Sequence, residues 1–233
     1  MPGMIWQIPL DETVREVALG LYVILVVIET RMAVNFLNSY AKNRELGFIG
    51  SIGLMYLFVA AGRVMLIIFD FYLTDFTYAL YGDYLTYYKI AIGMYAAGLG
   101  FLIYVAERAI FQGRDKYVFL IGYAFFNILS MVPPDVDTIT IFVTIGDLFI
   151  LFVPISYIYT AIKTKGPFRT QANYIWVGIA FFAAGAFVIG EGPMNILQGI
   201  LGTRYAVHII SVIFKMVGVV LIYRGFSYNI PKG

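Results

Sequence analysis

The chain has no cysteine among its 233 residues and only one histidine. The missing cysteines exclude disulfides, thiolate metal sites and cysteine nucleophiles. With His208 alone, no metal site can be built from several histidines, which excludes zinc-dependent seven-helix hydrolases. Charged residues make up 13% of the sequence, about half of the roughly 25% typical of soluble domains. That fraction leaves too little polar surface to cover a water-exposed fold of this size.

The motifs of common enzyme classes are also missing from the sequence. It contains no glycine-rich phosphate loop, no His–Glu metal pattern and no Gly-x-Ser-x-Gly elbow. It also lacks an aspartate-rich cluster of the kind that holds Mg²⁺ and diphosphate. The net charge of +2 is too small to suggest a nucleic-acid partner. We therefore expect a protein that is not an enzyme and that needs no cofactor or metal.

Apolar residues dominate what is present, at 61% of the chain, with 19 tyrosines and 20 phenylalanines. A helix needs about 20 apolar residues to cross a bilayer core, and nearly the whole length divides into such segments. We predict an all-α, multi-pass protein of the cell membrane that forms one domain over residues 1–233. The expected spans are Val14–Leu37, Gly47–Phe71, Leu85–Phe111, Tyr117–Val132, Thr138–Ile162, Asn173–Glu191 and Tyr205–Phe226. Within the fifth span, Pro154 predicts a kink.

The loop charges alternate along the chain. Odd-numbered loops are basic, and their bases include Lys42, Arg44, Arg114, Lys116, Lys163, Lys165 and Arg169. The second and fourth loops carry the acids Asp75, Asp83, Asp135 and Asp137 and no base. Basic loops stay in the cytoplasm, so the alternation predicts seven spans with the N-terminus outside and the C-terminus cytoplasmic.

Four ionisable residues are expected near the middle of the membrane. A helical rise of about 1.5 Å per residue places Arg63, Asp147 and Lys215 roughly 12–16 Å below the outer boundary, and Glu29 lies somewhat deeper. Each such group costs about 2.5–3.5 kcal/mol to insert, so each needs a partner or a water-filled cavity. We expect these two acids and two bases to form ion pairs at the floor of a polar cavity.

A second group of ionisable residues is expected closer to the outer boundary. It consists of Asp70, Lys89, Glu191 and His208. Together with the deeper set, these residues predict a polar pocket that opens outward. The alternative is purely structural: ion pairs that fix the helix register, with some of these side chains reaching to the interface.

A lysine in the middle of the last of seven helices invites comparison with retinal proteins. The segment His208–Arg224 superficially resembles the helix to which retinal is attached. Ser211 stands where those proteins have an acid one turn before the lysine, and only Trp6 and Trp176 are available for a tryptophan-walled pocket. Retinal binding through Lys215 is therefore a minor alternative.

Two short stretches resemble known membrane proteins. Gly166–Gly178 (GPFRTQANYIWVG) is similar to the entry of the sixth helix in the seven-helix N-terminal sensor regions of membrane histidine kinases, with Arg169 and Gln171 forming the Arg-x-Gln step. Gly62–Phe76 (GRVMLIIFDFYLTDF) resembles uncharacterised seven-helix membrane proteins of archaea. The resemblance implies a sensor whose outward pocket reads a ligand or the state of the membrane.

Two function classes follow from these observations. We expect a stand-alone seven-helix sensor or receptor-like protein, whose cytoplasmic signalling partner would dock on the basic loops with Arg114, Lys116, Lys163, Lys165 and Arg169. The alternative is a small ion, proton or solute transporter or channel that uses the same charged residues as a permeation path. Membrane lipids are expected neighbours, and faces rich in small residues leave a homo-oligomer open.

Overall fold

The computed structural model describes residues 10–44, 47–111 and 117–228, apart from the side chains of residues 10, 11 and 191. Regular structure in these ranges is helical throughout. The α-helices are α1 (Leu10–Lys42), α2 (Gly47–Ile67), α3 (Leu85–Phe111), α4 (Val118–Leu129), α5 (Val136–Ile150), α6 (Phe152–Lys163), α7 (Pro167–Val188), α8 (Glu191–Leu201) and α9 (Arg204–Ser227). A π-helix, η1 (Ile68–Leu73), extends α2, and a short 3-10 helix, η2 (Tyr78–Leu80), precedes α3.

Six helical segments are long and apolar enough to cross a membrane. They are Glu12–Lys42, Gly47–Leu73, Leu85–Phe111, Val136–Lys163, Pro167–Val188 and Arg204–Ser227. Their outer faces carry many exposed large apolar side chains, such as Val27, Phe125 and Ile155. Such a surface suits contact with lipid rather than with water. The chain is thus a helical bundle of the multi-pass membrane type.

The expected segments agree with the helices to different degrees. The third expected span coincides with α3. α4 has only 12 residues, so at about 1.5 Å per residue it is near 18 Å long. α8 lies between the sixth and seventh expected spans, where no helix is predicted from the sequence. The fifth span is divided into α5 and α6 at Leu151, because Pro154 has no N–H to continue the helical hydrogen bonds; the predicted kink is confirmed.

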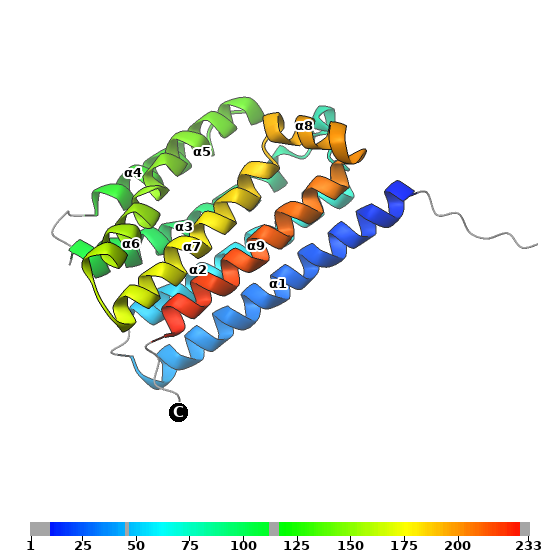
Figure 1. Cartoon of the computed structure of the whole chain (residues 1–233). Coiled ribbons are helices and arrows are strands. Elements are labelled where there is room, and N and C mark those ends of the chain that lie inside the picture. The colour runs from blue at the N-terminus through cyan, green and yellow to red at the C-terminus, as the bar shows by residue number, and fades with distance from the viewer. Residues whose placement is uncertain (1–9, 45–46, 112–116, 229–233) are drawn as a thin grey trace, which may run out of the picture.

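The bundle has two recognisable ends (Figure 1). One end holds α8 and the start of α1 and is called here the α8 end. The other end holds the last turn of α9 and the α6–α7 connection and is called the C-terminal end. α9 packs against α1 and α7, and α2 packs between α1 and α3. α5 packs mainly on α4 and only marginally on α3.

Glycines permit the closest helix contacts. A Cβ built on Gly178 would lie 2.8 Å from the carbonyl oxygen of Gly218, and one on Gly185 would lie 2.6 Å from that of Ser211. The Ser211 hydroxyl also donates a 2.6 Å hydrogen bond to the Gly185 carbonyl. α7 and α9 therefore form a backbone-to-backbone seam of the kind that small residues provide in membrane bundles.

Candidate functional site

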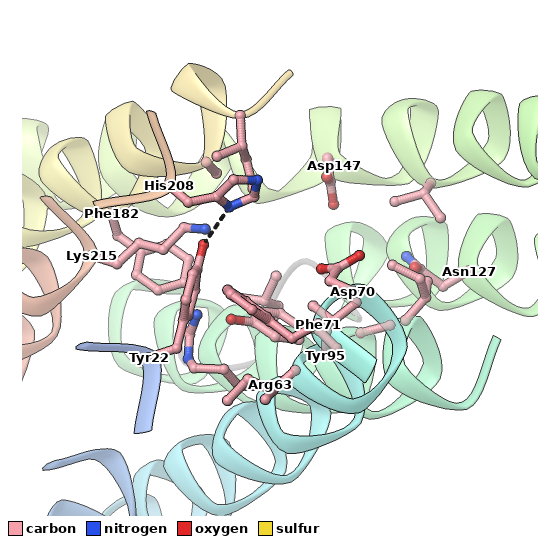
Figure 2. Close-up of a pocket in the computed structure, with 18 of the residues that line it drawn as sticks. Tyr22, Arg63, Asp70, Phe71, Tyr95, Asn127, Asp147, Phe182, His208 and Lys215 are labelled. Atoms are coloured by element: carbon pink, nitrogen blue, oxygen red, sulfur yellow. Dashed lines mark hydrogen bonds between the residues drawn. The ribbon is translucent and has the colours of Figure 1, made fainter. Parts of the chain in front are cut away.

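A cavity of about 200 Å³ lies inside the bundle, toward the α8 end (Figure 2). Its walls come from α1, α2 with η1, α3, α4, α5, α7 and α9. Five ionisable residues predicted from the sequence line it: Arg63, Asp70, Asp147, His208 and Lys215. Residues separated by more than 60 positions in the chain thus meet in one polar chamber within an apolar bundle.

The floor of the cavity is a buried ion pair between α1 and α2. Arg63 Nε donates to Glu29 Oε2 at 2.9 Å, and its Nη2 donates to Glu29 Oε1 at 2.7 Å. The two side chains are 2% and 0% exposed, and the ring of Tyr95 lies 5.4 Å from the guanidinium carbon. This two-pronged geometry satisfies both carboxylate oxygens at once, which is the arrangement in which a buried pair offsets its desolvation best.

Lys215 lies on the α9 wall without an ion pair. Among the described residues its ammonium has no hydrogen-bond or ion-pair partner, and its Nζ lies 5.9 Å from the centroid of the Tyr22 ring. The Tyr22 hydroxyl bonds instead to His208 Nδ1 at 3.1 Å. His208 Nε2 is buried and has no hydrogen-bond partner in the described part of the chain. This wall therefore presents two nitrogen groups that remain open to a further partner.

Two carboxylates occupy the opposite side. Asp70 belongs to η1 and Asp147 to α5, and their carboxylates point toward one another across the cavity (Figure 2). Neither carboxylate makes an ion pair or a hydrogen bond with the described residues. Single π-helical turns are often found at functional sites, and here the turn carries an acid into the chamber.

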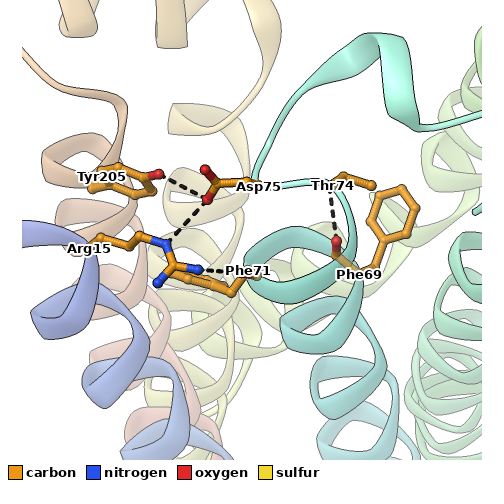
Figure 3. Close-up of polar contacts among 6 residues, drawn as sticks. All are labelled: Arg15, Phe69, Phe71, Thr74, Asp75 and Tyr205. Atoms are coloured by element: carbon orange, nitrogen blue, oxygen red, sulfur yellow. Dashed lines mark hydrogen bonds and ion pairs between the residues drawn. The ribbon is translucent and has the colours of Figure 1, made fainter. Parts of the chain in front are cut away.

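A loop closes the cavity at the α8 end on the side of α1 and α9. Phe76 is 6% exposed, and its ring centroid lies 4.3 Å from that of His208. Its neighbour Asp75 accepts from Arg15 Nε at 3.2 Å and from the Tyr205 hydroxyl at 3.0 Å (Figure 3). Arg15 also bonds to the Phe71 carbonyl, and Arg204 donates to the Phe76 carbonyl at 3.0 Å. Both Asp75 and Phe76 have positive φ, which non-glycine residues keep only when their surroundings impose it.

The remaining predicted site residues stand apart from this chamber. Glu29 does not line the cavity, and both of its carboxylate oxygens accept hydrogen bonds from Arg63. Lys89 is half-buried on α3 and is not among the residues that line the cavity. Glu191 begins α8, but its side chain lies outside the described residues, as do Arg114 and Lys116 of the predicted partner surface. The expected pairing of two mid-membrane acids with two bases is found only for Glu29 and Arg63.

Several residues of the site were not singled out by the sequence analysis. They include the cavity residues Tyr22, Tyr95, Tyr123 and Asn127. The sequence spacing offers a signal for Tyr22, which lies seven residues before Glu29. The same spacing separates two other pairs, Arg63 with Asp70 and His208 with Lys215. Seven residues are two helical turns, so each pair shares a helix face.

One buried acid was overlooked entirely. Glu107 on α3 is 0% exposed, and its Oε1 accepts from the Phe119 backbone N–H at 2.8 Å. Phe119 is in the first turn of α4, where backbone N–H groups lack partners within the helix. Glu107 thus fastens the start of α4 to α3, far from the cavity lining.

Comparison with protein-family models, with curated proteins and with solved structures gives no significant match. The function has to be argued from the chemistry of the site itself.

Proposed function

We propose that the protein is a membrane sensor or receptor-like protein whose ligand binds in the central cavity. The observation that carries this proposal is a chamber with unpaired groups of both signs above a sealed floor. An isolated charge in a membrane bundle is expensive, so Asp70, Asp147 and Lys215 are better explained by a bound partner than by packing. A volume of about 200 Å³ suits a small ligand, since drug-sized sites have about 300–1,000 Å³.

The packed aromatic layer beneath the cavity favours a receptor over a transporter or channel. Below the Glu29–Arg63 pair, Phe36 stacks on Tyr56 with 5.9 Å between ring centroids. The Tyr56 hydroxyl donates to the Val219 carbonyl of α9 at 3.1 Å. This aromatic layer links α1, α2 and α9 and separates the chamber from the C-terminal end of the bundle.

For the topology we propose seven crossings, with α4 as the shortest, the N-terminus outside and the C-terminus cytoplasmic. α3 ends at the C-terminal end, whereas α5 begins at the α8 end (Figure 1), so α4 and its flanking residues have to return the chain. The exposed bases Lys163, Lys165 and Arg169 lie at the C-terminal end, which agrees with a cytoplasmic position. The chamber then opens toward the outside.

A relay would run through α9. Lys215 faces the cavity, and about two turns further along α9 Tyr223 and Arg224 reach the C-terminal end. A cytoplasmic partner of acidic character would find Lys163, Lys165 and Arg169 there. The similarity of Gly166–Gly178 to sensor regions of histidine kinases supports the same assignment.

The absence of native cysteine allows a clean test by single-cysteine labelling in liposomes. Thr144→Cys, on α5 next to the cavity, is expected to react with a membrane-impermeant thiol reagent. Ala33→Cys, which is 0% exposed in the wild type and lies one turn beyond Glu29, is expected to stay unreactive from both sides. The same liposomes are expected to show no flux of protons, Na⁺, K⁺ or neutral amino acids above empty controls. Labelling of Ala33→Cys together with flux would reject the sensor.

A transporter is the second candidate, and one observation favours it. A polar groove of about 950 Å³ opens at the C-terminal end between α1, α7 and α9, lined among others by Asn35, Lys42, Tyr223 and Arg224. Two hollows separated by an aromatic layer and an ion pair are the arrangement that alternating access requires. Arg63→Ala would then raise flux, whereas in a sensor it would only weaken the fold.

A further inference from the structure

The charges of the cavity are sorted by sign. Lys215 and His208 lie on the α9 wall, while Asp70 and Asp147 face one another from η1 and α5 (Figure 2). No ion pair joins the two sides within the described part of the chain. A ligand of a single charge would satisfy one side and leave the other desolvated, which is costly in a low-dielectric interior.

Arg63 is not available as the principal anion-binding group. Its Nε and Nη2 are both committed to Glu29. An anionic group of a ligand therefore meets Lys215 first, and the buried His208 Nε2, which has no partner among the described residues, is a second hydrogen-bonding atom on the same wall. A cationic group meets two carboxylates, which together can hold one positive charge from both sides.

A polar stripe on α5 leads from the α8 end to the cavity. Asp137, Thr140, Thr144 and Asp147 follow one another at intervals of three or four residues, so they share a helix face. The exposed Thr140 and Thr144 hydroxyls each donate at 2.8 Å to the carbonyl four residues earlier. A hydroxyl oxygen that donates one hydrogen bond can still accept others, and at Thr140 the Tyr88 side chain already contributes a hydrogen bond. Asp137 already accepts from the Tyr78 hydroxyl, but the side chains of the stripe are acids and hydroxyls without a base, which suits the entry of a positively charged group.

The opposite approach is blocked. Phe76 covers His208 and is held by the contacts of Asp75 with Arg15 and Tyr205 (Figure 3). The stripe on α5, which packs mainly on α4, is the more open side of the chamber.

We infer that the ligand is a small zwitterion, with its anionic group at Lys215 and His208 and its cationic group between Asp70 and Asp147. This inference rests on the proposed ligand-binding role of the cavity and adds the chemical class of the ligand. Amino acids and betaines belong to this class and fit the available volume. The orientation follows from entry along α5, with the anionic group leading to the far wall and the cation remaining at the acids.

Three isosteric probes test the inference by calorimetry on the purified full-length chain in nanodiscs. Glycine betaine is a zwitterion, choline lacks its carboxylate, and 3,3-dimethylbutyrate replaces its ammonium by carbon. A panel of neutral amino acids accompanies them. Each missing charged contact is expected to weaken binding by about tenfold or more, so betaine or an amino acid binds best.

Substitutions in the cavity test which residues bind the anionic group of the ligand and which bind its cationic group. Lys215→Met is expected to abolish the preference for betaine over choline, and Asp147→Asn the preference for betaine over 3,3-dimethylbutyrate. If Asp147→Asn does not yield folded protein, Asp70→Asn tests the same preference for betaine over 3,3-dimethylbutyrate. Lys215→Gln likewise replaces Lys215→Met as the test of the preference for betaine over choline. Asp83→Asn makes the same chemical change on the exposed 82–84 turn and is expected to leave all affinities unchanged.

The outcomes separate the two proposals. Binding of choline or 3,3-dimethylbutyrate at Lys215 or Asp147, with no binding of any zwitterion, overturns the inference and leaves the ligand-binding cavity standing. Zwitterion binding that none of the cavity variants changes also overturns it. If no probe binds and none protects Thr144→Cys from labelling, the inference and the receptor role fail together.

Discussion

Two sets of charges lie close together in this bundle, yet their environments differ. Glu29 and Arg63 are almost fully buried and satisfy one another through two hydrogen bonds. Asp70, Asp147 and Lys215 line a cavity and have no ionic partner among the described residues. The first set stabilises contacts between α1 and α2, while the second is held in place at a cost. Charged residues in the spanning helices thus either stabilise the bundle, where they are paired, or line the cavity, where they are not.

Breaking the paired set should have the largest effect. Arg63→Met leaves the Glu29 carboxylate buried without a partner, and such a loss costs about 3–5 kcal/mol. The free energy of unfolding, measured by denaturant titration in mixed micelles, should fall by that amount. The double variant Glu29→Gln/Arg63→Met is expected to recover much of the loss, because no charge then stays unpaired. Equal losses in the single and double variants would contradict the pairing.

Removing a charge from the unpaired set should raise the free energy of unfolding instead of lowering it. Lys215→Met removes an ammonium that has no ionic partner, and the cost of inserting such a group, about 2.5–3.5 kcal/mol, limits the gain. We expect the unfolding free energy to rise by about 1–3 kcal/mol in the absence of ligand. A fall comparable to that of Arg63→Met would mean that Lys215 has a stabilising partner, and the contrast between the two sets would disappear.

A smaller effect is expected where the cavity wall is held by one neutral hydrogen bond. Tyr22→Phe removes the hydroxyl that bonds to His208 Nδ1 at 3.1 Å, which should cost about 1 kcal/mol. The shift in thermal midpoint gives the measurement. Tyr87→Phe, on an exposed position of α3, is the matched control and should leave the midpoint unchanged.

The smallest effect is expected at the start of α5, outside the spanning segments. The Asp135 side chain accepts from the Thr138 N–H at 2.7 Å, and this bond lowers the pKa of Asp135 below its ordinary value. A lowered folded-state pKa means that the stabilisation is present above the unfolded pKa of about 3.9 and is lost as pH falls through the folded value. Wild type should therefore melt higher than Asp135→Ala at pH 6, and the difference should shrink toward pH 2. The exposed Asp83→Ala should show no such convergence.

The sequence predicted local features well because their causes are local. The extent of α3 and the break near Pro154 follow from apolar length and from a missing N–H. The charged residues that line the cavity (Arg63, Asp70, Asp147, His208 and Lys215) could be singled out because ionisable side chains are conspicuous in apolar helices.

What the sequence could not predict depends on how the helices are rotated against one another. Nothing in the sequence around Arg63 identifies Glu29 rather than Asp147 as its partner, since Asp147 is expected at the depth of Arg63 and Glu29 only somewhat deeper. α8 escaped notice because its 11 residues follow one glycine and end at another. Glu107 was missed because its partner is a backbone N–H at the start of α4, which carries no mark in the sequence.

The π-helical turn of η1 has a consequence for the mechanics of the site. The Thr74 N–H bonds to the Phe69 carbonyl five residues back, at 3.0 Å, so this turn holds one residue more than an α-helical turn would. Slipping it to an α-helical register would rotate the following residues by about 100°. Asp75 would then swing away from Arg15 and Tyr205, and Phe76 from His208. The hydrogen-bond register of η1 therefore fixes the position of Asp70 at the cavity together with the positions of Asp75 and Phe76 above it.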